Sequence, residues 1–575
     1  MSEETLREQR IKKRDAVRAL GIDPYGGRFP DVSTSTAVRA LAEGLDIKPG
    51  EKSSVRARLA GRVVLMRLMG KLAFATIRDG VGTLQLGLSR GDLGDVQWEL
   101  LKNIDLGDIV GADGILGRTK TNELTLWVDK LTLLTKSLQP PPEKWHGLTD
   151  VDLRYRRRYV DLFANPDVRE VFRQRSAIIQ AIREYLVGEN YMEVETPVLQ
   201  PIYGGAAARP FTTHHNTLDM KLFLRISPEL YLKRLLVGGL ERVFEFSRNF
   251  RNEGISTKHN PEFSMLELYE AYADYHVMME RVEGMVSAAY YVSARELVVQ
   301  RHFALEAELR IDKEWSIVME DIRREWKNQS EQNISGPDVG NPLKNRIKKL
   351  EKVDSQRTKR VQMLSLNERA FDLMKKGHLA TIYKDDLIDF KPPWRRASYD
   401  ALLREHAGIS MQDGAAARAK AKQLGIDPAG KDDAVVVNEV FERTVEHHLI
   451  QPTFVYDYPA AICPLTRRHP DDSSIALRFE AFVAGMELGN AYTELNDPQV
   501  QAENFSRQVA GEGEETMAVM DEDFVTALEY GMPPAGGLGV GIDRLVMLLT
   551  DSHSIRDVIL FPLQRPLGSV VCERA

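Results

Sequence analysis

Between Val55 and Ser137, apolar residues fall in short runs separated by turn-forming residues. Short runs of this kind, with turn signals such as Asp79-Gly80 and Thr121-Asn122, are typical of β-strands. The runs cover residues 55–67, 72–79, 83–88, 109–116 and 124–134. Five strands within about 80 residues predict a small barrel, and the OB-fold is the leading candidate.

After the barrel, the pattern alternates between helical and strand-like segments. Residues 168–188 place apolar side chains such as Ile178 and Ile182 at helical spacing, which predicts an amphipathic helix. Shorter segments resemble strands at 193–196, 221–226 and 243–249, and an apolar helix at 545–549. The predicted fold class is therefore α+β, with the barrel first.

Two segments are dominated by charge. Residues 1–50 open with a helical pattern crowded with basic residues, namely Arg7, Arg10, Lys12, Lys13, Arg14 and Arg18. This is either a solvated helix face or a phosphate-binding helix, and charge alone favours the solvated face. Residues 298–384 are rich in Lys, Arg, Glu and Gln and contain Ser335-Gly336-Pro337. Trp315, Ile322 and Trp326 lie there at roughly helical spacing.

These patterns divide the chain into successive parts. We expect a helical extension at 1–50, the barrel at 51–140, a linker at 141–160 that starts in a Pro-rich stretch, and a larger domain at 161–575. Residues 298–384 interrupt the larger domain as an insertion of unknown role. Because the charge of this segment is only weakly basic, we expect it to be a solvated surface module.

Composition narrows the class of protein. A chain of 575 residues with 43% hydrophobic and 28% charged residues is globular and too long for a single core. The net charge of −7 excludes a basic nucleic-acid binder but not a basic face. Cys463 and Cys572 are too few for a disulfide framework, and the start of the chain lacks an apolar run. We expect a cytoplasmic protein with no membrane span.

The strongest local signal for chemistry is Asn249-Phe250-Arg251-Asn252-Glu253, followed by His259-Asn260 and Phe263. An arginine on a strand can hold a phosphate through two hydrogen bonds. Glu253 could accept from an adenine amino group, and Phe263 could stack on the base. The alternative is an ordinary strand salt bridge between Arg251 and Glu253.

A glycine-rich run, Gly536-Gly537-Leu538-Gly539-Val540-Gly541, precedes Arg544 at the start of an apolar helix. It allows the backbone to approach a nucleotide closely. It is not a dinucleotide-binding fingerprint, since the acidic residues that follow, Asp551 and Asp557, come too soon.

Three glutamates complete the set of candidates. Glu480 and Glu487 are seven residues apart and would converge in a hairpin, where hard oxygen ligands suit Mg²⁺. The alternative is a pair of solvated glutamates. Glu494 lies among small and aromatic residues, where a carboxylate requires a cation. That cation is either a ligand or an internal lysine.

In this order, the motifs resemble those of class II aminoacyl-tRNA synthetases. Pro197 after a long helix resembles motif 1, the segment from Phe250 to Phe263 resembles motif 2, and the segment from Gly539 to Arg544 resembles motif 3. Four further strings narrow the resemblance to the lysyl-tRNA synthetases. They are Gly204-Gly205-Ala206-Ala207-Ala208-Arg209-Pro210-Phe211, Ser227-Pro228-Glu229-Leu230-Tyr231-Leu232-Lys233, His259-Asn260-Pro261-Glu262-Phe263 and Asn490-Ala491-Tyr492-Thr493-Glu494-Leu495-Asn496-Asp497.

The resemblance implies an architecture and a set of partners. It implies an OB-fold that reads the tRNA anticodon through Arg67, Phe74, Gln85 and Glu123. It also implies a catalytic domain built on an antiparallel sheet flanked by helices, and a homodimer formed through motif 1. The expected activity is the ATP-dependent attachment of lysine to the 3′ end of its tRNA.

The resemblance also implies roles for individual residues. ATP would be held by Arg251, Glu253, His259, Asn260, Phe263, Glu480 and Arg544, with Arg251 and Arg544 catalytic. Mg²⁺ would be bound by Glu480 and Glu487. Lysine would be bound by Gly205, Glu229, Arg251, Glu267, Tyr269, Asn490, Tyr492 and Glu494, of which Tyr269 and Glu494 receive the ε-ammonium.

The sequence departs from the family at a few positions. Cys463 stands where serine is usual, the barrel lacks the aromatic often found near Gly87, and the insertion has no counterpart that we identify. Three alternatives differ in function. They are an aspartyl- or asparaginyl-tRNA synthetase, an enzyme that modifies proteins and lacks the barrel, and an inactive RNA-binding relative. Ser227-Pro228-Glu229 argues against the first, the barrel against the second, and the full set of charged residues against the third.

Overall fold

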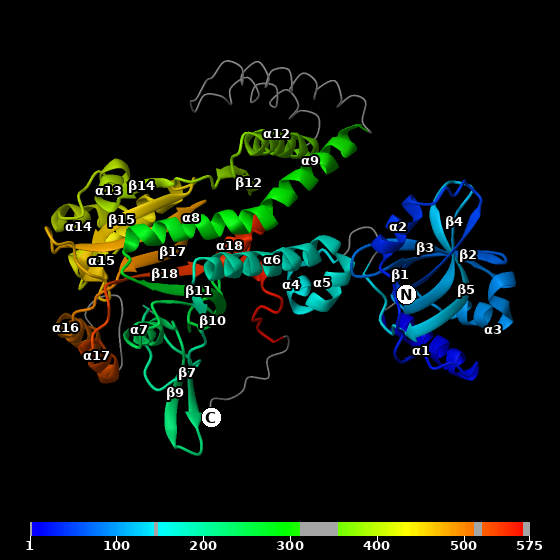
Figure 1. Cartoon of the computed structure of the whole chain (residues 1–575), viewed down its shortest axis with the longest axis horizontal. Coiled ribbons are helices and arrows are strands. Elements are labelled where there is room, and N and C mark those ends of the chain that lie inside the picture. The colour runs from blue at the N-terminus through cyan, green and yellow to red at the C-terminus, as the bar shows by residue number, and fades with distance from the viewer. Residues whose placement is uncertain (1–2, 143–147, 207, 311–354, 511–519, 567–575) are drawn as a thin grey trace. The chain divides into compact units, whose positions relative to one another are not determined.

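The computed structural model describes residues 3–142, 148–206, 208–310, 355–510 and 520–566. These residues form two compact units, Met1–Asn165 and Pro166–Ala575 (Figure 1). Each unit has its own hydrophobic core. None of the helices in the described ranges is long and apolar enough to cross a membrane.

The first unit contains a closed five-stranded barrel, which confirms the predicted OB-fold architecture. Its strands are β1 (Lys52–Met69), β2 (Leu72–Arg78), β3 (Thr83–Ser89), β4 (Ile109–Arg118) and β5 (Leu124–Thr135), in the order β1-β2-β3-β5-β4. Alternate side chains point inward, as on β2, where Ala73, Ala75 and Ile77 are buried. Helix α3 (Arg90–Lys102) connects β3 to β4, and α4 (Val151–Arg156) and α5 (Arg158–Ala164) follow the barrel.

The basic N-terminal helix is partly built into the barrel. Val17 of α1 (Glu3–Ala19) is buried in the barrel core, which α2 (Ser35–Glu43) also joins. Arg10 donates to the backbone oxygens of Ser137 and Leu106 at 3.0 and 2.8 Å. The prediction of a wholly solvated helix face is therefore wrong for this side of α1, although Arg7, Lys12 and Arg18 are exposed.

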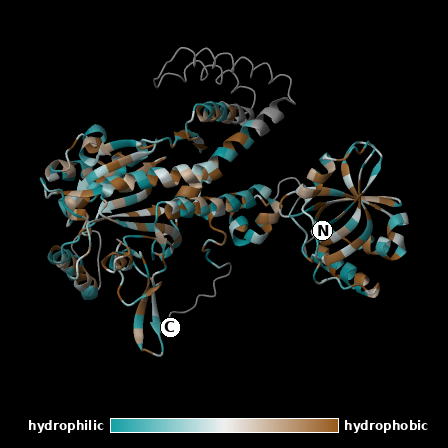
Figure 2. Ribbon diagram, viewed as in Figure 1, coloured by the Kyte–Doolittle hydropathy of each residue, from teal (hydrophilic) through white to brown (hydrophobic). Residues whose placement is uncertain are grey.

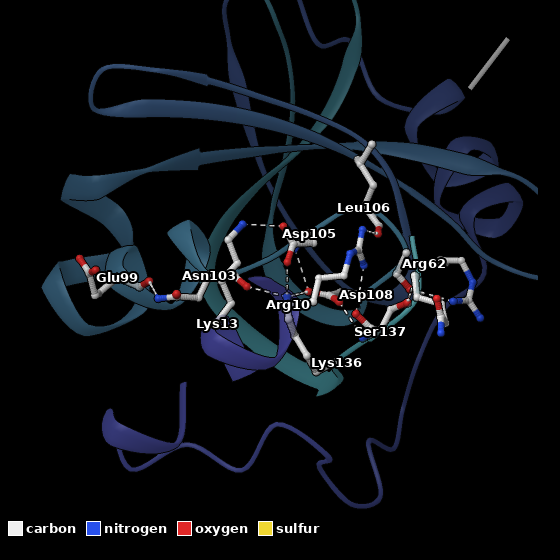
Figure 3. A network of polar contacts seen from close by, with 12 residues as sticks. Arg10, Lys13, Arg62, Glu99, Asn103, Asp105, Leu106, Asp108, Lys136 and Ser137 are labelled. Atoms are coloured by element: carbon white, nitrogen blue, oxygen red, sulfur yellow. Dashed lines mark hydrogen bonds and ion pairs between the residues drawn. The ribbon is translucent and has the colours of Figure 1, made fainter. Parts of the chain in front are cut away.

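Ion pairs extend this attachment to residues that flank β4 and β5 (Figure 3). Lys13 Nζ lies 2.5 Å from Asp105, and Lys136 Nζ lies 2.7 Å from both Asp105 and Asp108. The side chains of Lys136 and Asp108 are fully buried. Removing one partner of such a buried pair strongly destabilises the protein, because the other charge is left uncompensated.

We expect Lys136→Met to lower the free energy of unfolding of the first unit by about 3–5 kcal/mol, because it leaves Asp108 buried without its cation. Calorimetric unfolding of the whole chain measures the effect. Lys102→Met is the matched control, because Lys102 pairs with Glu99 at the surface and an exposed pair contributes about 0–1 kcal/mol. Equal stability of the two variants would contradict the account.

The second unit is built on an eight-stranded sheet. Its order is β14 (Arg395–Ser398), β15 (Thr453–Pro459), β16 (Ile475–Val483), β17 (Met486–Thr493), β18 (Ala535–Gly541), β11 (Glu262–Ala271), β10 (Arg242–Phe250) and β6 (Met192–Glu193). Neighbouring strands are antiparallel, as expected, except for the parallel edge pairs β14–β15 and β10–β6. The strand expected at 193–196 is wrong in extent, since only Met192 and Glu193 pair.

Helices flank this sheet. The predicted helix at 168–188 is confirmed as α6 (Pro166–Gly188), which packs beside α8 (Tyr275–Val292) (Figures 1 and 2). With α18 (Ile542–Thr550), these helices bury the main core against the sheet. A second cluster joins α7 (Glu229–Val237), α16 (Pro498–Val509) and α17 (Glu522–Glu529) to the sheet strands.

Smaller elements complete the unit. They are the three-stranded sheet β7 (Leu199–Gln200), β9 (Met220–Leu224) and β8 (Thr212–His215), the helices α13 (Tyr399–Ala407), α14 (Gly414–Gln423), α15 (Asp433–Thr444) and α19 (Ile555–Val558), and the 3₁₀ turns Glu446–His448 and Ala460–Ile462. The helices α13, α14 and α15 share a core with β15.

The segment 298–384 is less peripheral than expected. Its described parts are most of α9 (Ala294–Arg310), all of α12 (Ser355–Lys375) and the strand β12 (Ala380–Tyr383), which pairs with β13 (Asp386–Asp389). Its ends are close together, since Val298, Ala370 and Ala380 form one buried cluster. They are not on the surface, however, and Tyr383 belongs to the main core. The helical spacing predicted around Trp315, Ile322 and Trp326 lies outside the described residues.

Candidate active site

The candidate site lies on one face of the central strands. Successive side chains of a strand point to opposite faces, and Leu266 and Leu268 of β11 lie in the core under α6 and α8. Glu267 and Tyr269 therefore point to the other face, where they line a cavity. The same alternation on β16, β17 and β18 exposes to this cavity Arg478, Glu480, Asn490, Tyr492, Gly537 and Gly539.

Two cavities adjoin on this face. Arg251, Met265, Glu487 and Asn490 line both, so the two form one continuous depression. The first also contains Glu253, Lys258, His259, Asn260, Phe263 and Arg544. The second contains Gly205, Ser227, Glu229, Glu267, Tyr269, Arg478, Glu480 and Tyr492. The structure thus brings together the predicted ATP and lysine residues, with Glu480 in the second cavity and Glu494 lining neither.

Arg251 stands at the junction of the two cavities. It follows the last residue of β10, and its backbone N–H donates to Pro261 across the loop at 2.9 Å. Its guanidinium lies over the ring of Phe263, 5.1 Å from the centroid. Its Nε is buried and has no hydrogen-bond partner among the described residues. A fixed cation with an unused donor is suited to bind an anion here.

Arg544 and His259 form the outer wall of the first cavity. Arg544 Nη1 donates to the backbone oxygen of Glu487 at 2.6 Å, and its Nη2 lies 3.3 Å from His259 Nε2. Burial and the nearby Arg544 lower the pKa of His259. The imidazole is therefore neutral at pH 7. Because arginine only donates, Nε2 accepts and Nδ1 carries the proton toward Ser256.

Glu480 and Glu487 face the junction from the hairpin of β16 and β17. Glu480 accepts from Tyr458 at 2.9 Å and also from Arg478. Burial, with Glu487 nearby, raises the pKa of Glu480 to about 7. Burial acts on Glu487 too, but Arg544 and Arg478 outweigh it and lower the pKa of that carboxyl.

This carboxylate pair suits a divalent cation. No cluster of three or more metal-ligating side chains occurs within the described parts of the chain. Mg²⁺, however, is commonly held by one or two carboxylates together with substrate phosphates. Glu487 lies close enough to raise the pKa of Glu480, and a bound cation would relieve the repulsion between the two carboxylates.

The second cavity ends at an acid wall, which is formed by the side chains of Glu229 and Glu267. Glu267 accepts from the hydroxyl of Ser227 at 3.0 Å, and burial with the neighbouring Glu229 raises its pKa to about 8. Gly205 has a φ of +84°, and a Cβ there would press against Glu229 and Ser227, so the loop can approach α7 only with glycine. The backbone at Gly205 and the base of the Glu229 side chain therefore lie side by side.

Glu494 lies directly beneath this wall. A Cβ on Gly537 would overlap Glu494 Oε1 and the ring of Tyr269, so the missing side chain opens the cavity toward the acid. Glu494 already has a cation, because Lys233 Nζ lies 2.5 Å from Oε2. The internal lysine considered from the sequence is therefore present. Oε1 has no hydrogen-bond partner in the described structure.

The barrel presents a separate face of candidate residues. The strand register places Arg67, Phe74, Gly87 and Trp127 in one row across β1, β2, β3 and β5. The rings of Phe74 and Trp127 meet edge to face, 6.0 Å between centroids. Gln85 lies on the same face, two residues before Gly87, and donates to Thr125 at 2.8 Å. Glu123 is exposed just before β5.

Comparison with known proteins assigns this architecture. The model of class II tRNA synthetases (D, K and N) matches residues 150–565, and that of the OB-fold nucleic acid binding domain matches residues 57–134. The chain belongs to the class II tRNA synthetase family. Residues 150–565 include both cavities and also span the segment 298–384.

Within this family, the chain is similar over nearly its whole length to proteins named lysine–tRNA ligases. The lysine–tRNA ligase of Moorella thermoacetica is 45% identical over 98% of this chain and 99% of its own length. That of Carboxydothermus hydrogenoformans is 44% identical over 97% of each chain. That of Nostoc punctiforme is 42% identical over 99% of this chain and 90% of its own.

Three residues of this synthetase were missed by sequence reasoning. Lys233 ends the segment 227–233 that resembles the lysyl-tRNA synthetases, but nothing in the sequence shows that it is buried. Arg478 precedes Glu480 by two residues on one strand, a spacing that signals a shared face. Trp127 packs over Gly87, where its ring fills the space of a side chain. Trp127 therefore places an aromatic ring beside Gly87, although the sequence has none close to that glycine.

Proposed function

We propose that this chain is a lysine–tRNA ligase, which activates L-lysine with ATP to lysyl-adenylate and pyrophosphate and then transfers lysine to the 3′ end of its tRNA. One observation carries the choice of lysine. Three buried carboxylates, Glu229, Glu267 and Glu494, gather at the end of the second cavity. The relatives that match this chain over nearly its whole length are named lysine–tRNA ligases.

The first cavity takes ATP in this proposal. Phe263 stacks on the adenine, and Glu253, His259 and Asn260 bind the remainder of the nucleotide. Arg251 holds the α-phosphate at the junction, and Arg544 holds the γ-phosphate end. Glu480 and Glu487 would hold Mg²⁺, which supplies charge neutralisation to the phosphates when bound.

The second cavity takes lysine. Glu229 and the backbone at Gly205 bind the α-ammonium, and Glu267 and Asn490 order that part of the pocket. Tyr269 and Glu494, beside Tyr492, receive the ε-ammonium. Arg251 binds the lysine carboxylate as well as the α-phosphate, so it brings together the two groups that react.

Adenylation needs no general base in this site. The lysine carboxylate is already ionised and attacks the α-phosphorus, and the bond to pyrophosphate breaks. Negative charge grows on the α-phosphate during this step, and a fixed guanidinium at Arg251 stabilises it without reorganisation. In the second step the terminal hydroxyl of the tRNA attacks the adenylate carbonyl and AMP leaves.

The acids argue against the other members of the family group, whose substrates are aspartate and asparagine. Glu229 and Glu494 would repel the side-chain carboxylate of aspartate. Aspartate and asparagine have no side-chain ammonium, so the cost of burying these carboxylates would be offset less well than with lysine. A polar site that requires a specific partner rejects analogues that lack it by about 10⁴–10⁵.

Lysine binding should release protons. Burial raises the pKa of both Glu267 and Glu494 to about 8, so both carry protons in the empty pocket below that pH. The two ammonium groups of lysine favour the ionised carboxylates, which lowers these pKa values on binding. Lysine affinity should therefore rise with pH from 6.5 toward 8, by up to about tenfold per pH unit for each proton released.

Calorimetry of lysine binding at pH 7, in two buffers of different ionisation enthalpy, measures this release. We expect the full-length protein to release about one or two protons for each lysine molecule that it binds. Glu267→Gln should reduce the number, because that residue then has no proton to lose. Binding without any proton release at pH 7 would contradict the proposed acid wall.

The barrel face binds the anticodon in this proposal. Arg67, Gln85 and Glu123 surround the aromatic pair of Phe74 and Trp127. Unpaired bases stack on such rings for roughly 1–3 kcal/mol each. The catalytic cavities belong to the other unit, so this face takes no part in adenylation.

We expect Phe74→Ala to raise the KM for tRNA about 5–100-fold, in line with the loss of one stacking platform. Lysine-dependent pyrophosphate exchange should stay at the wild-type rate. Leu68→Ala is the control, because Leu68 is exposed one residue from Arg67 and so points to the other side of the strand. A parallel loss of charging and exchange would show that Phe74 supports folding instead.

A homodimer formed through motif 1 remains part of the proposal. The edge strand β6 and its neighbours carry exposed apolar side chains at Val187, Met192, Val198 and Leu199. An exposed apolar patch beside a sheet edge is typical of a protein interface. A cytoplasmic location accords with Cys463, which is a free, buried thiol.

A further inference from the structure

Lys233 is a buried charge that the proposed chemistry does not use. It lies on α7, one helical turn after Glu229, and its Nζ is 2.6 Å from Glu229 Oε1. The same Nζ is also 2.5 Å from Glu494 Oε2, so it lies between the two carboxylates. The lysine side chain is 0% exposed and lines neither cavity. One ammonium group thus joins the proposed α-ammonium and ε-ammonium receptors from behind.

Stability does not explain this triad. Burying three charges costs desolvation energy that their attraction barely offsets, and apolar residues of similar size are often as stable. The same helix supplies such residues at Leu232 and Leu236, which pack in an apolar cluster. A lysine at position 233 therefore points to a need for charge at this place.

We propose that Lys233 is a positioning residue for substrate specificity: it fixes Glu229 and Glu494 at a set separation, so that the pocket accepts a molecule with two ammonium groups at that separation. This inference rests on the proposed roles of Glu229 and Glu494 in lysine binding. It also accounts for the net charge of the lysine pocket. Of the three carboxylates, one is matched by Lys233 and two remain for the two ammonium groups of lysine.

The groups around Glu494 support this balance. Lys233 and Glu229 face it from α7 and Tyr269 faces it from β11, while Glu267 and Tyr492 also act on Tyr269. Burial raises the pKa of Glu494, Lys233 lowers it, and the net value is about 8. Of the groups around Glu494, Lys233 alone carries a positive charge in the described structure. Without Lys233 the pKa of Glu494 rises further, so removing its proton when lysine binds at pH 7 costs more free energy.

Lys233→Met and Lys233→Gln test the inference in the full-length protein. KM values for lysine and ATP are measured by pyrophosphate exchange from pH 7 to pH 9. At pH 7 we expect the lysine KM to rise at least about tenfold, which corresponds to one unit of pKa at Glu494. The difference from wild type should shrink toward pH 9, as Glu494 ionises again, while the ATP KM stays within about twofold.

Lys136→Met is the matched control, since Lys136 is also fully buried between two carboxylates but in the barrel unit. It should leave the lysine KM and its pH dependence unchanged. A wild-type lysine KM in both Lys233 variants, or an increase that is the same at every pH, would overturn the inference. Loss of cooperative thermal unfolding in both variants would also overturn it, since Lys233 would then serve stability. Absence of lysine-dependent exchange in the wild type would instead refute the proposed function.

Discussion

Arg251→Lys should lower the rate of lysine-dependent pyrophosphate exchange by about 10²–10³-fold, the loss typical when one donor to a developing anion is removed. The lysine side chain keeps the positive charge but lacks the planar fork that can bind a phosphate and a carboxylate together. It also loses the contact with the ring of Phe263. The effect should lie mainly in kcat, because the charge on the α-phosphate is greatest in the transition state.

Arg248→Lys is the control for this prediction. Arg248 lies on β10, three residues before Arg251, but its side chain is 49% exposed and its nearest acidic partner, Glu262, is 4.0 Å away, so its replacement should leave exchange unchanged. An Arg251→Lys enzyme with near-normal exchange would show that Arg251 does not act on the transition state. A loss confined to the KM for ATP would show that it only binds the nucleotide.

Glu494→Gln should raise the KM for lysine about 10–100-fold, because a charge-assisted contact worth about 1.5–3 kcal/mol becomes a neutral one. The substitution also leaves Lys233 paired with Glu229 alone. The added positive charge near the ε-ammonium then opposes lysine binding further. ATP binding should change little, since Glu494 does not line the first cavity.

Steady-state exchange at varied lysine measures this effect, with Glu503→Gln on the exposed side of α16 as the control. If Glu494→Gln activates lysine with a wild-type KM, the ε-ammonium is bound elsewhere. Glu229 would then be the next candidate, because it shares Lys233 with Glu494.

Much of the fold was predictable from short-range patterns. The five barrel strands and α6 follow from periodicity, because strands and amphipathic helices repeat every two and every three to four residues. The same patterns failed where pairing decides the structure. Residues 193–196 look like a strand, yet of these only Glu193 belongs to the two-residue strand that pairs with β10, and Pro197 limits the rest. The charged N-terminal helix looked solvated because the partner of Arg10 lies 127 residues away.

The residues of the candidate site were identified by resemblance, and their arrangement was not. Glu480 and Glu487 are seven positions apart, but their approach depends on the hairpin of β16 and β17. The partner of Glu494 lies on α7, far away in sequence, so no local rule reveals it. From its charge, the segment 298–384 was expected to be a solvated module, and yet Ile382 and Tyr383 within it are buried.

The central claim is that this synthetase selects lysine by charge. Exchange of labelled pyrophosphate into ATP, with each of the twenty amino acids in turn, tests it most directly. The account predicts exchange with lysine and at least about 10⁴-fold less with aspartate, asparagine and methionine, which lack an ammonium side chain. Exchange that is supported best by aspartate or asparagine, or by no amino acid at all, would contradict it.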